Sequence, residues 1–245
     1  MVTEKTLSEA LARYTARTGR TLHDPVAALF DMDGVLYDSM PRHSIAWKQM
    51  CDENGIAADP DEFYALEGRT GASTIDILVY RQFGRHTTDE EVRRLYARKS
   101  ELFKAMGRPI VMPGALSAVE AVTEEGGKPV LVTGSGQASL LESLNLDYHG
   151  AFPADRRVTA HDVIHGKPDP EPYLKGLEKV GAACDRAVAI DNAPLGVESA
   201  SAAGVLTIGV RTGPLPAGSL LAAGADTELT SMDEVAELLR MIFNM

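Results

Sequence analysis

Two pairs of oxygen-bearing side chains, far apart in the sequence, directly follow short apolar runs. Asp31 and Asp33 come after VAALF at 26–30, and Asp191 and Asn192 follow AVAI at 187–190. Two carboxylates as close as Asp31 and Asp33 repel each other, so one has a raised pKa or a cation lies between them. Mg²⁺ suits carboxylates that act near phosphate. All four residues are candidate metal ligands, although either pair could also be an ordinary turn or helix cap.

Two further motifs are suited to binding an anion. LVTGSGQAS at 131–139 presents Thr133, Gly134 and Ser135 between an apolar run and a helical pattern, so that backbone N–H groups can point at a phosphate. HGKPDPEPY at 165–173 holds Lys167 before two prolines, which fix the backbone around a point charge. Alone, the first motif could be a tight turn and Lys167 a solvated side chain. An acid pair, a hydroxyl–glycine turn, a lysine–proline turn and an acid–amide pair follow one another along the chain. Together they favour a functional site over four unrelated turns.

The apolar runs predict how these motifs are positioned. VAALF, PVLVT at 129–133, AVAI and VLTIGV at 205–210 are short, apolar on both faces and separated by helical patterns. Such runs are typical of a parallel sheet covered by helices on both sides. We therefore predict an α/β fold with a doubly wound, Rossmann-like core. Ligands bind at the carboxyl edge of such sheets, and that is where the four motifs fall.

A long helical insertion interrupts the α/β pattern. About 30 residues suffice for a βαβ unit, whereas about 100 separate Asp31 from Thr133. Helices are predicted over 43–55, 61–68, 72–84 and 88–107, the last with Thr88 as N-cap, and again over 115–127. We assign residues 1–40 and 109–245 to the core and 41–108 to an inserted helical domain. Residues 5–18 predict a further amphipathic helix before the core.

Together these motifs resemble those of the haloacid dehalogenase superfamily, in the branch with a helical cap inserted after the first motif. The similarity runs from about Val26 to the C-terminus and is nearest to β-phosphoglucomutase-like proteins and phosphatases of small phosphates. The resemblance implies that Asp31 is the nucleophile, which forms an aspartyl-phosphate, and that Asp33 is the general acid and base. It implies that Thr133 and Lys167 bind the transferring phosphoryl group. The metal would be Mg²⁺, bound by Asp31, the backbone carbonyl of Asp33, Asp191 and Asn192.

The resemblance also suggests substrate-binding residues, most of them in the cap. His43 and Trp47 occupy positions where β-phosphoglucomutases place a His and a Trp. The other candidates are Arg69, Thr70, Lys99, Gly134 and Ser135. β-Phosphoglucomutases have an Arg in the cap loop and a Lys after the Ser of the second motif. This chain has Gly71 and Gly136 at those positions. We therefore predict a phosphatase for a small sugar or polyol phosphate, with a phosphosugar mutase as the alternative.

Composition limits the remaining functions. The chain has 245 residues with 24 Lys and Arg against 35 Asp and Glu, a net charge of −11, and no basic cluster. We therefore expect no nucleic-acid partner, and no apolar run is long enough for a membrane span. Two cysteines cannot form a disulfide framework, so we predict a cytoplasmic protein. We also predict a monomer. A dehalogenase, a phospho-receiver domain and a catalytically silent binding module are weaker alternatives.

Overall fold

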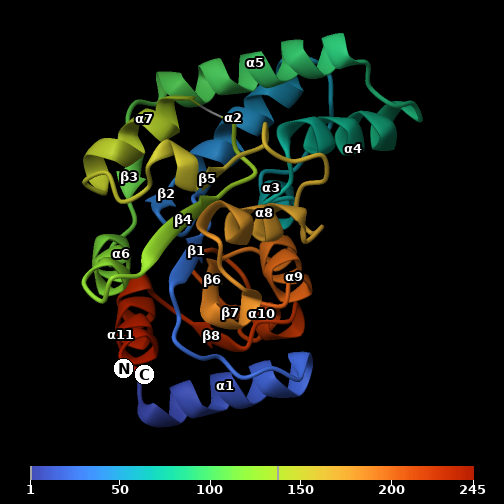
Figure 1. The fold of residues 1–245 in the computed structure, drawn as a ribbon. Helices are drawn as coiled ribbons and strands as arrows, with labels where there is room; N and C mark the ends of the chain where they lie inside the picture. The colour runs from blue at the N-terminus through green and yellow to red at the C-terminus, as the bar shows by residue number, and fades with distance from the viewer. Residues whose placement is uncertain (1, 137) are drawn as a thin grey trace.

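The computed structural model of the chain describes residues 2–136 and 138–245. A six-stranded parallel sheet forms its centre, in the order β5–β4–β1–β6–β7–β8 (Figure 1). Its strands are β1 (Ala27–Phe30), β4 (Lys128–Val132), β5 (Arg157–Val158), β6 (Ala187–Asp191), β7 (Leu206–Val210) and β8 (Thr227–Leu229). Because β4 and β6 flank β1 on opposite sides, the winding reverses beside β1 and opens a crevice at the carboxyl edge. The predicted doubly wound α/β fold is confirmed.

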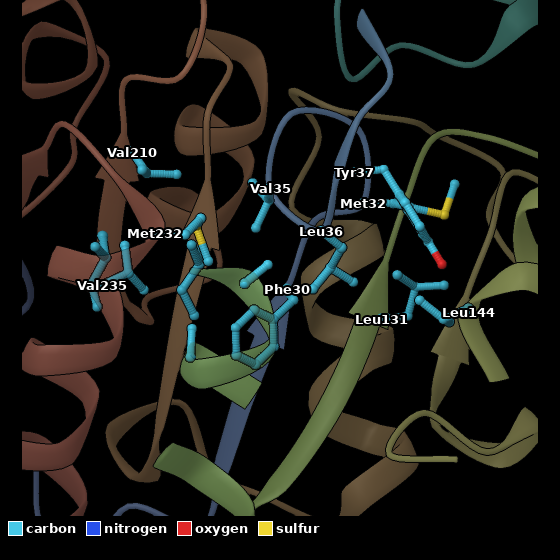
Figure 2. Packing of buried hydrophobic residues seen from close by; sticks show 14 of the residues in the cluster. Phe30, Met32, Val35, Leu36, Tyr37, Leu131, Leu144, Val210, Met232 and Val235 are labelled. Carbon is cyan, nitrogen blue, oxygen red and sulfur yellow. The ribbon is translucent and has the colours of Figure 1, made fainter. Parts of the chain in front are cut away.

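Alternate residues of the central strands pack into two hydrophobic layers. Phe30 and Leu131 face a layer that includes Met232 and Val235 (Figure 2). Their neighbours Leu29, Val130 and Val132 face the opposite layer, with the buried Tyr173 and Leu177. Burying a large apolar side chain contributes about 1.5–3 kcal/mol, so both layers hold the sheet in place.

Helices cover both faces of the sheet. α6 (Ala115–Thr123) and α11 (Met232–Phe243) supply the first layer, whereas α8 (Glu171–Val180) and α9 (Pro194–Ala202) supply the second. The remaining core elements are α7 (Ala138–Asp147), α10 (Ser219–Ala222) and the short 3₁₀ helices η1 (Ala154–Arg156) and η2 (Cys184–Arg186). Helix α6 ends four residues earlier than predicted, before the left-handed Gly126 (φ +75°).

The inserted segment forms four helices beyond the carboxyl edge of the sheet (Figure 1). They are α2 (Met40–Glu53), α3 (Glu62–Ala65), α4 (Gly71–Phe83) and α5 (Asp89–Ala105). Thr88 caps α5 in a reciprocal capping box with Glu91, as its position predicted. Helix α2 begins before the predicted residue 43 because Pro41 lies in its first turn. Helix α3 is shorter than predicted, and the chain turns at Gly68 (φ +89°).

Two short strands connect the insertion to the core. β2 (Tyr37–Asp38) pairs antiparallel with β3 (Ile110–Val111). The sequence did not predict this pair, nor β5 and β8, because strands of two or three residues form no recognisable apolar run. The domain boundary at residues 41 and 108 remains a prediction.

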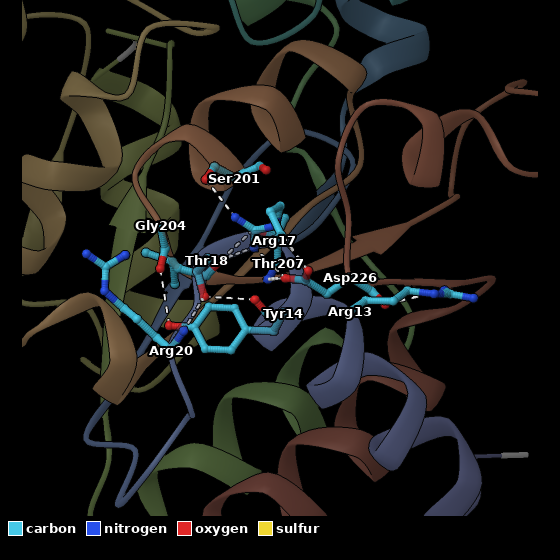
Figure 3. A network of polar contacts seen from close by, with 10 residues as sticks. Arg13, Tyr14, Arg17, Thr18, Arg20, Ser201, Gly204, Thr207 and Asp226 are labelled. Atoms are coloured by element: carbon cyan, nitrogen blue, oxygen red, sulfur yellow. Dashed lines mark hydrogen bonds and ion pairs between the residues drawn. The ribbon is translucent and has the colours of Figure 1, made fainter.

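The first helix, α1 (Glu4–Thr18), is fastened to the end of the sheet remote from the insertion (Figure 1). Arg17 donates from Nε and Nη2 to the buried carboxylate of Asp226, at 3.1 and 2.6 Å, and from Nη1 to the Ser201 carbonyl at 2.8 Å (Figure 3). The Val2 N–H donates to Glu237 of α11 at 2.9 Å, so the start of the chain lies against its last helix. Of the helices described, none is long and apolar enough to cross a membrane.

Candidate active site

The carboxyl edge of the sheet brings the predicted catalytic side chains together. Asp31 directly follows β1, Thr133 directly follows β4, and Asp191 is the last residue of β6. A pocket of about 550 Å³ opens there, lined from the core by Asp31, Asp33 and Thr133. From the insertion, Trp47, Arg69 and Lys99 are among the residues that line it. Core and insertion therefore share one pocket.

Lys167 joins two strand ends through a buried ion network. Its Nζ lies 2.5 Å from Asp31 Oδ1 and 2.7 Å from Asp191 Oδ2. Burial alone would lower the pKa of Lys167, but the two carboxylates outweigh it and hold that pKa above its ordinary value. Burial also raises the pKa of Asp31; Lys167 opposes this rise, whereas Asp191 and Asp33 add to it. Lys167 is therefore the shared cation of Asp31 and Asp191. One positive charge does not neutralise both carboxylates, so negative charge remains at this edge of the sheet.

The carboxylate of Asp191 is held on all sides by the core. Besides Lys167, Tyr173 donates its hydroxyl to Oδ2 at 2.6 Å, and the Ala193 N–H donates to Oδ1 at 3.0 Å. A Cβ at Gly196 would lie 2.0 Å from this carboxylate, so only glycine fits there. Asp191 thus holds Lys167 in position.

Asp33 is stabilised in its ionised form. Its Oδ1 accepts from Ser39 Oγ at 2.5 Å and lies 2.9 Å from His43 Nε2. Burial would raise the pKa of Asp33, but His43 and the hydrogen bond from Ser39 prevail and lower it to about 2. His43 lines the pocket as well as contacting Asp33, so its predicted contact with substrate stays a prediction.

Lys99 of α5 continues this contact into the insertion. Its Nζ lies 2.6 Å from His43 Nδ1, so a neutral His43 that accepts there carries its proton on Nε2 and donates it to Asp33. The ring of His43 stacks on Phe103 at 4.2 Å. Burial lowers the pKa of His43, and Lys99 lowers it further, in keeping with the neutral form.

Aromatic rings surround the ammonium group of Lys99. The group lies 5.0 Å from the ring centroid of Trp47, 5.9 Å from Tyr96 and 5.3 Å from Phe103. Burial lowers the pKa of Lys99 to about 7, although Asp33 opposes this shift. Trp47, predicted to bind substrate, stacks on Phe63 and forms one wall of the pocket.

The turn after β4, which the sequence predicts to bind an anion, lines the pocket. Thr133 Oγ1 accepts from the Ser135 N–H at 3.0 Å, and Thr133, Gly134 and Ser135 all line the pocket. A Cβ at Gly134 would lie 2.6 Å from the Gly68 carbonyl oxygen, so the insertion lies directly on this turn. Gln137, at the end of the same motif, lies outside the described residues.

The segment between α3 and α4 places Arg69 and Thr70 differently. Arg69 lines the pocket, its Nη1 lies 3.5 Å from Ser73 Oγ, and its buried Nε has no hydrogen-bond partner among the described residues. Thr70 instead caps α4, accepting from the Ser73 N–H at 3.3 Å, and is not among the residues that line the pocket. Its predicted contact with substrate stays a prediction.

Glu67 and Asn192 form a direct contact between insertion and core. Asn192 Nδ2 donates to Glu67 Oε1 at 2.9 Å. Burial raises the pKa of Glu67 well above its usual range; the hydrogen bond from Asn192 opposes this, and Asp31 and Asp191 add to it. Asn192 Oδ1 is buried and accepts no hydrogen bond from the described residues. An orphaned amide oxygen beside several carboxylates is a fit for a hard cation.

The donor set for Mg²⁺ is therefore mixed. Among the residues that the structure describes, no three His, Cys, Asp or Glu side chains form a ready metal cluster. Asp31 and Asp191 each accept a hydrogen bond from Lys167 through one carboxylate oxygen. One carboxylate oxygen of Asp33 contacts His43. Asn192 Oδ1 is the donor that has no hydrogen-bond partner among the described residues, whereas Asp31 and Asp191 each share an oxygen with Lys167. That Asp31, Asp33, Asp191 and Asn192 bind the metal stays a prediction.

The sequence reasoning missed three residues of this site. Glu67 stands in the segment EGRTGAS beside Arg69, and an acid next to a left-handed glycine in the insertion was the available signal. Tyr173 ends the motif HGKPDPEPY, six residues after Lys167 and in the first turn of α8. Ser39 gives no signal of its own, since it resembles an ordinary helix cap.

Comparison with known proteins agrees with this geometry. Residues 26–204 match the family model described as haloacid dehalogenase-like hydrolase. A phosphorylated carbohydrates phosphatase of Thermotoga maritima is 30% identical over 88% of this chain and 99% of its own length. Hexitol phosphatase A of Escherichia coli is 28% identical over 84% of this chain and 91% of its own length.

Solved structures show the same fold. A protein from Bacteroides vulgatus, provisionally named a β-phosphoglucomutase, superposes with a TM-score of 0.93 at 42% identity, covering 99% of this chain and 100% of its own. The agreement spans the core, the inserted helices and the region of α1.

Proposed function

This chain belongs to the haloacid dehalogenase-like hydrolase family, and from that premise we propose that it is a Mg²⁺-dependent phosphatase of a small phosphorylated metabolite, a sugar or polyol phosphate, acting through an aspartyl-phosphate. The inserted helices, the cap of this family, would close over the substrate. The observation that carries the proposal is the position of Asp31, which lines the pocket while Lys167 holds one of its oxygens at 2.5 Å.

The first step is attack on phosphorus. Lys167 binds Asp31 Oδ1 and leaves Oδ2 free of it, so Oδ2 forms the bond to phosphorus while the bond to the leaving oxygen breaks. Thr133 and the backbone N–H group of Gly134 would bind the phosphoryl oxygens, while the Ser135 N–H holds the Thr133 hydroxyl in position. Lys167 offsets the negative charge that gathers on these groups.

Asp33 acts as the general acid and base. The pKa of Asp33 is about 2 without substrate, so protonating the leaving oxygen requires that the negative charge of the bound phosphate raise it. Once the leaving group departs, Asp33 takes a proton from the water that hydrolyses the aspartyl-phosphate. His43, held by Lys99, keeps the carboxylate oriented.

Asp31, the backbone carbonyl of Asp33, Asp191 and Asn192 would hold Mg²⁺, which leaves the Asp33 carboxyl for proton transfer. When bound, the ion supplies electrostatic stabilisation of the phosphoryl oxygens. The relatives that are named phosphatases of phosphorylated carbohydrates and hexitols support the substrate class.

Two glycines favour hydrolysis over the mutase reaction. A mutase must hold a second phosphate with a fixed cation. A Cβ at Gly71 would lie 2.1 Å from the Tyr96 ring, and one at Gly136 would lie 2.7 Å from His161 Nε2. No arginine or lysine fits either position without rearrangement, and Lys99 is committed to His43, so Arg69 is the cation in the pocket lining that a mutase would have to use. The relative named β-phosphoglucomutase from Bacillus subtilis keeps the mutase as the alternative.

A substrate panel tests the proposal. Purified protein with and without Mg²⁺ is given p-nitrophenyl phosphate, inorganic pyrophosphate, glycerol 1-phosphate, hexose and hexitol phosphates, and 2-chloropropionate. We expect Mg²⁺-dependent release of phosphate, fastest from a sugar or polyol phosphate, and no release of halide. Fastest turnover of pyrophosphate would contradict the proposed substrate class while keeping the chemistry.

A second assay separates phosphatase from mutase. β-Glucose 1-phosphate with a trace of the 1,6-bisphosphate is followed for both glucose 6-phosphate and free phosphate. Rapid isomerisation with little phosphate would establish the mutase instead.

A further inference from the structure

A second pocket lies behind the catalytic one. It has a volume of about 390 Å³, and Gly34, Asp38, Tyr64, Asn192 and Gly213 are among the residues that line it. Glu67 and Met40 line both pockets, so they form part of the wall between them. The metal-binding edge of the site can therefore be approached from two directions.

The two pockets differ in whether cationic side chains line them. Arg69 and Lys99 line the catalytic pocket, together with the carboxyl groups of Asp31, Asp33 and Glu67. Asp38 and Glu67 line the second pocket, and no Lys, Arg or His is among the described residues that do so. Asp38, Glu67 and Asp61 all act on the Tyr64 hydroxyl by raising its pKa, after burial, which has the largest effect. An acidic pocket attracts cations and repels phosphates.

Asn192, a predicted metal ligand, is among the residues that line the second pocket. The residue is 2% exposed and holds the Oδ1 atom that accepts no hydrogen bond from the described residues. This is independent of the acidic lining, because a buried amide oxygen without a donor favours a cation whatever the charge around it.

The second pocket is not the place where the segment around Gly68 lies on the core. The Gly68 carbonyl lies over Gly134 at the catalytic pocket, so a substrate there requires the cap to move. The second pocket instead lies beside the connecting strands, with Asp38 in β2 and Met112 just after β3. Points near such connections move least when a domain rotates about them.

We propose that the acidic pocket is a separate route by which the divalent cation reaches and leaves the site, while the phosphorylated substrate uses the catalytic pocket. The proposal rests on the Mg²⁺ dependence proposed above. Its test measures metal exchange rather than turnover, so the two can fail separately.

Gly213 offers a way to obstruct the pocket. A Cβ there would meet only the Tyr64 ring at 3.9 Å, which is ordinary contact, so larger side chains can grow into the space. Gly213→Leu is the obstructed variant and Gly213→Ala its matched control. Association of Tb³⁺, a hard cation, is followed by luminescence sensitised by the aromatic residues, and dissociation by mixing with EDTA.

We expect Gly213→Leu to slow association and dissociation alike, by about tenfold each, with the dissociation constant unchanged within about twofold. An obstruction raises the same barrier in both directions and leaves the ligands untouched. Gly213→Ala should exchange Tb³⁺ as the wild type does. Equal rates in all three proteins would overturn the proposal, and so would a slower association with unchanged dissociation.

Charge gives a second test that does not depend on packing. Asp38→Asn should slow association by about threefold at low salt and weaken its dependence on ionic strength. Asp61→Asn removes an equal charge near Tyr64 but outside the pocket lining, and should have a smaller effect. Identical effects of the two variants would show general attraction rather than a route. If circular dichroism shows Gly213→Leu to be unfolded, this pair decides the question.

Discussion

Two lysines in this molecule are equally buried, at 2% exposure each, yet their surroundings differ in kind. Lys167 in the core lies between two carboxylates, which hold its pKa above the ordinary value. Lys99 in the cap lies among aromatic rings and beside a neutral histidine, and burial lowers its pKa to about 7. The buried charge of Lys167 is therefore fully compensated by carboxylates in the core. The buried charge of Lys99 in the cap is only partly compensated, which lowers the stability of the folded protein.

The two lysines on opposite sides of the pocket therefore have different roles. A fully paired lysine fixes Asp31 for one chemical step and adds to stability. A poorly compensated lysine destabilises the fold, and such cost is tolerated where function requires it. The comparison predicts that changes on the core side abolish chemistry, while changes on the cap side alter rate and stability in opposite directions.

The largest effect is expected from the nucleophile on the core side. Asp31→Asn should lower turnover by about 10³-fold or more, since an amide cannot attack phosphorus. Its thermal midpoint should stay near that of the wild type. Asp52→Asn, at an exposed position, is the control for handling and charge. Residual activity above a few per cent would remove Asp31 from its proposed role.

Removing the core lysine should damage both activity and fold. Lys167→Met leaves Asp31 and Asp191 buried without their cation, so we expect a loss of about 3 kcal/mol in the free energy of unfolding and at least a hundredfold loss of turnover. Urea denaturation without metal measures the first quantity. Lys128→Met, at an exposed position of β4, should change little. A stable Lys167→Met protein would show that the pair contributes nothing to folding.

The same substitution in the cap should act in the opposite sense on stability. Lys99→Met removes a buried ammonium and should stabilise the protein by about 1 kcal/mol at pH 6, while turnover falls by about tenfold because His43 loses its partner. The folded pKa of Lys99 is lowered, so wild-type stability is poorest below about pH 7 and recovers as pH rises towards 10.5.

The advantage of the methionine variant should therefore shrink between pH 7 and pH 10. Denaturation curves at pH 6, 8 and 9.5 measure it. A Lys99→Met protein less stable than the wild type at every pH would mean that the aromatic contacts outweigh the cost of burial.

The smallest change expected is in metal affinity. Asn192→Asp adds a carboxylate to the donor set, so the Mg²⁺ concentration at half saturation should fall several-fold, as measured by calorimetry. In the metal-free protein the same change places two carboxyl groups together, because Glu67 loses the donor Nδ2. An equal midpoint in both proteins would indicate that Asn192 only holds the cap. Asn54→Asp, at the end of α2, serves as control.

The core was predictable because its pattern is local. Short apolar runs give the strands, and parallel strands bring their carboxyl ends to one edge, so Asp31, Thr133 and Asp191 had to lie near one another. The long helix α5 was predictable from Thr88 and its acidic first turn. These features depend on neighbouring residues.

The cap side of the site was not predictable in the same way. The contacts of Lys99 with His43 and of Glu67 with Asn192 join residues 56 and 125 positions apart. Nothing in the spacing of these residues records how the inserted helices rest on the core. The two strands that connect cap and core are likewise too short to produce a pattern.

The contact between Val2 and Glu237 also bears on how the chain can be rewired. Both ends approach α11, at the end of the molecule farthest from the inserted helices (Figure 1). A short Gly/Ser linker could join them, and new ends could be cut in an exposed turn of the core, giving a circular permutant with its pocket intact. The same geometry suits attachment to a solid support, because a tether at either end would leave the pocket facing the solution.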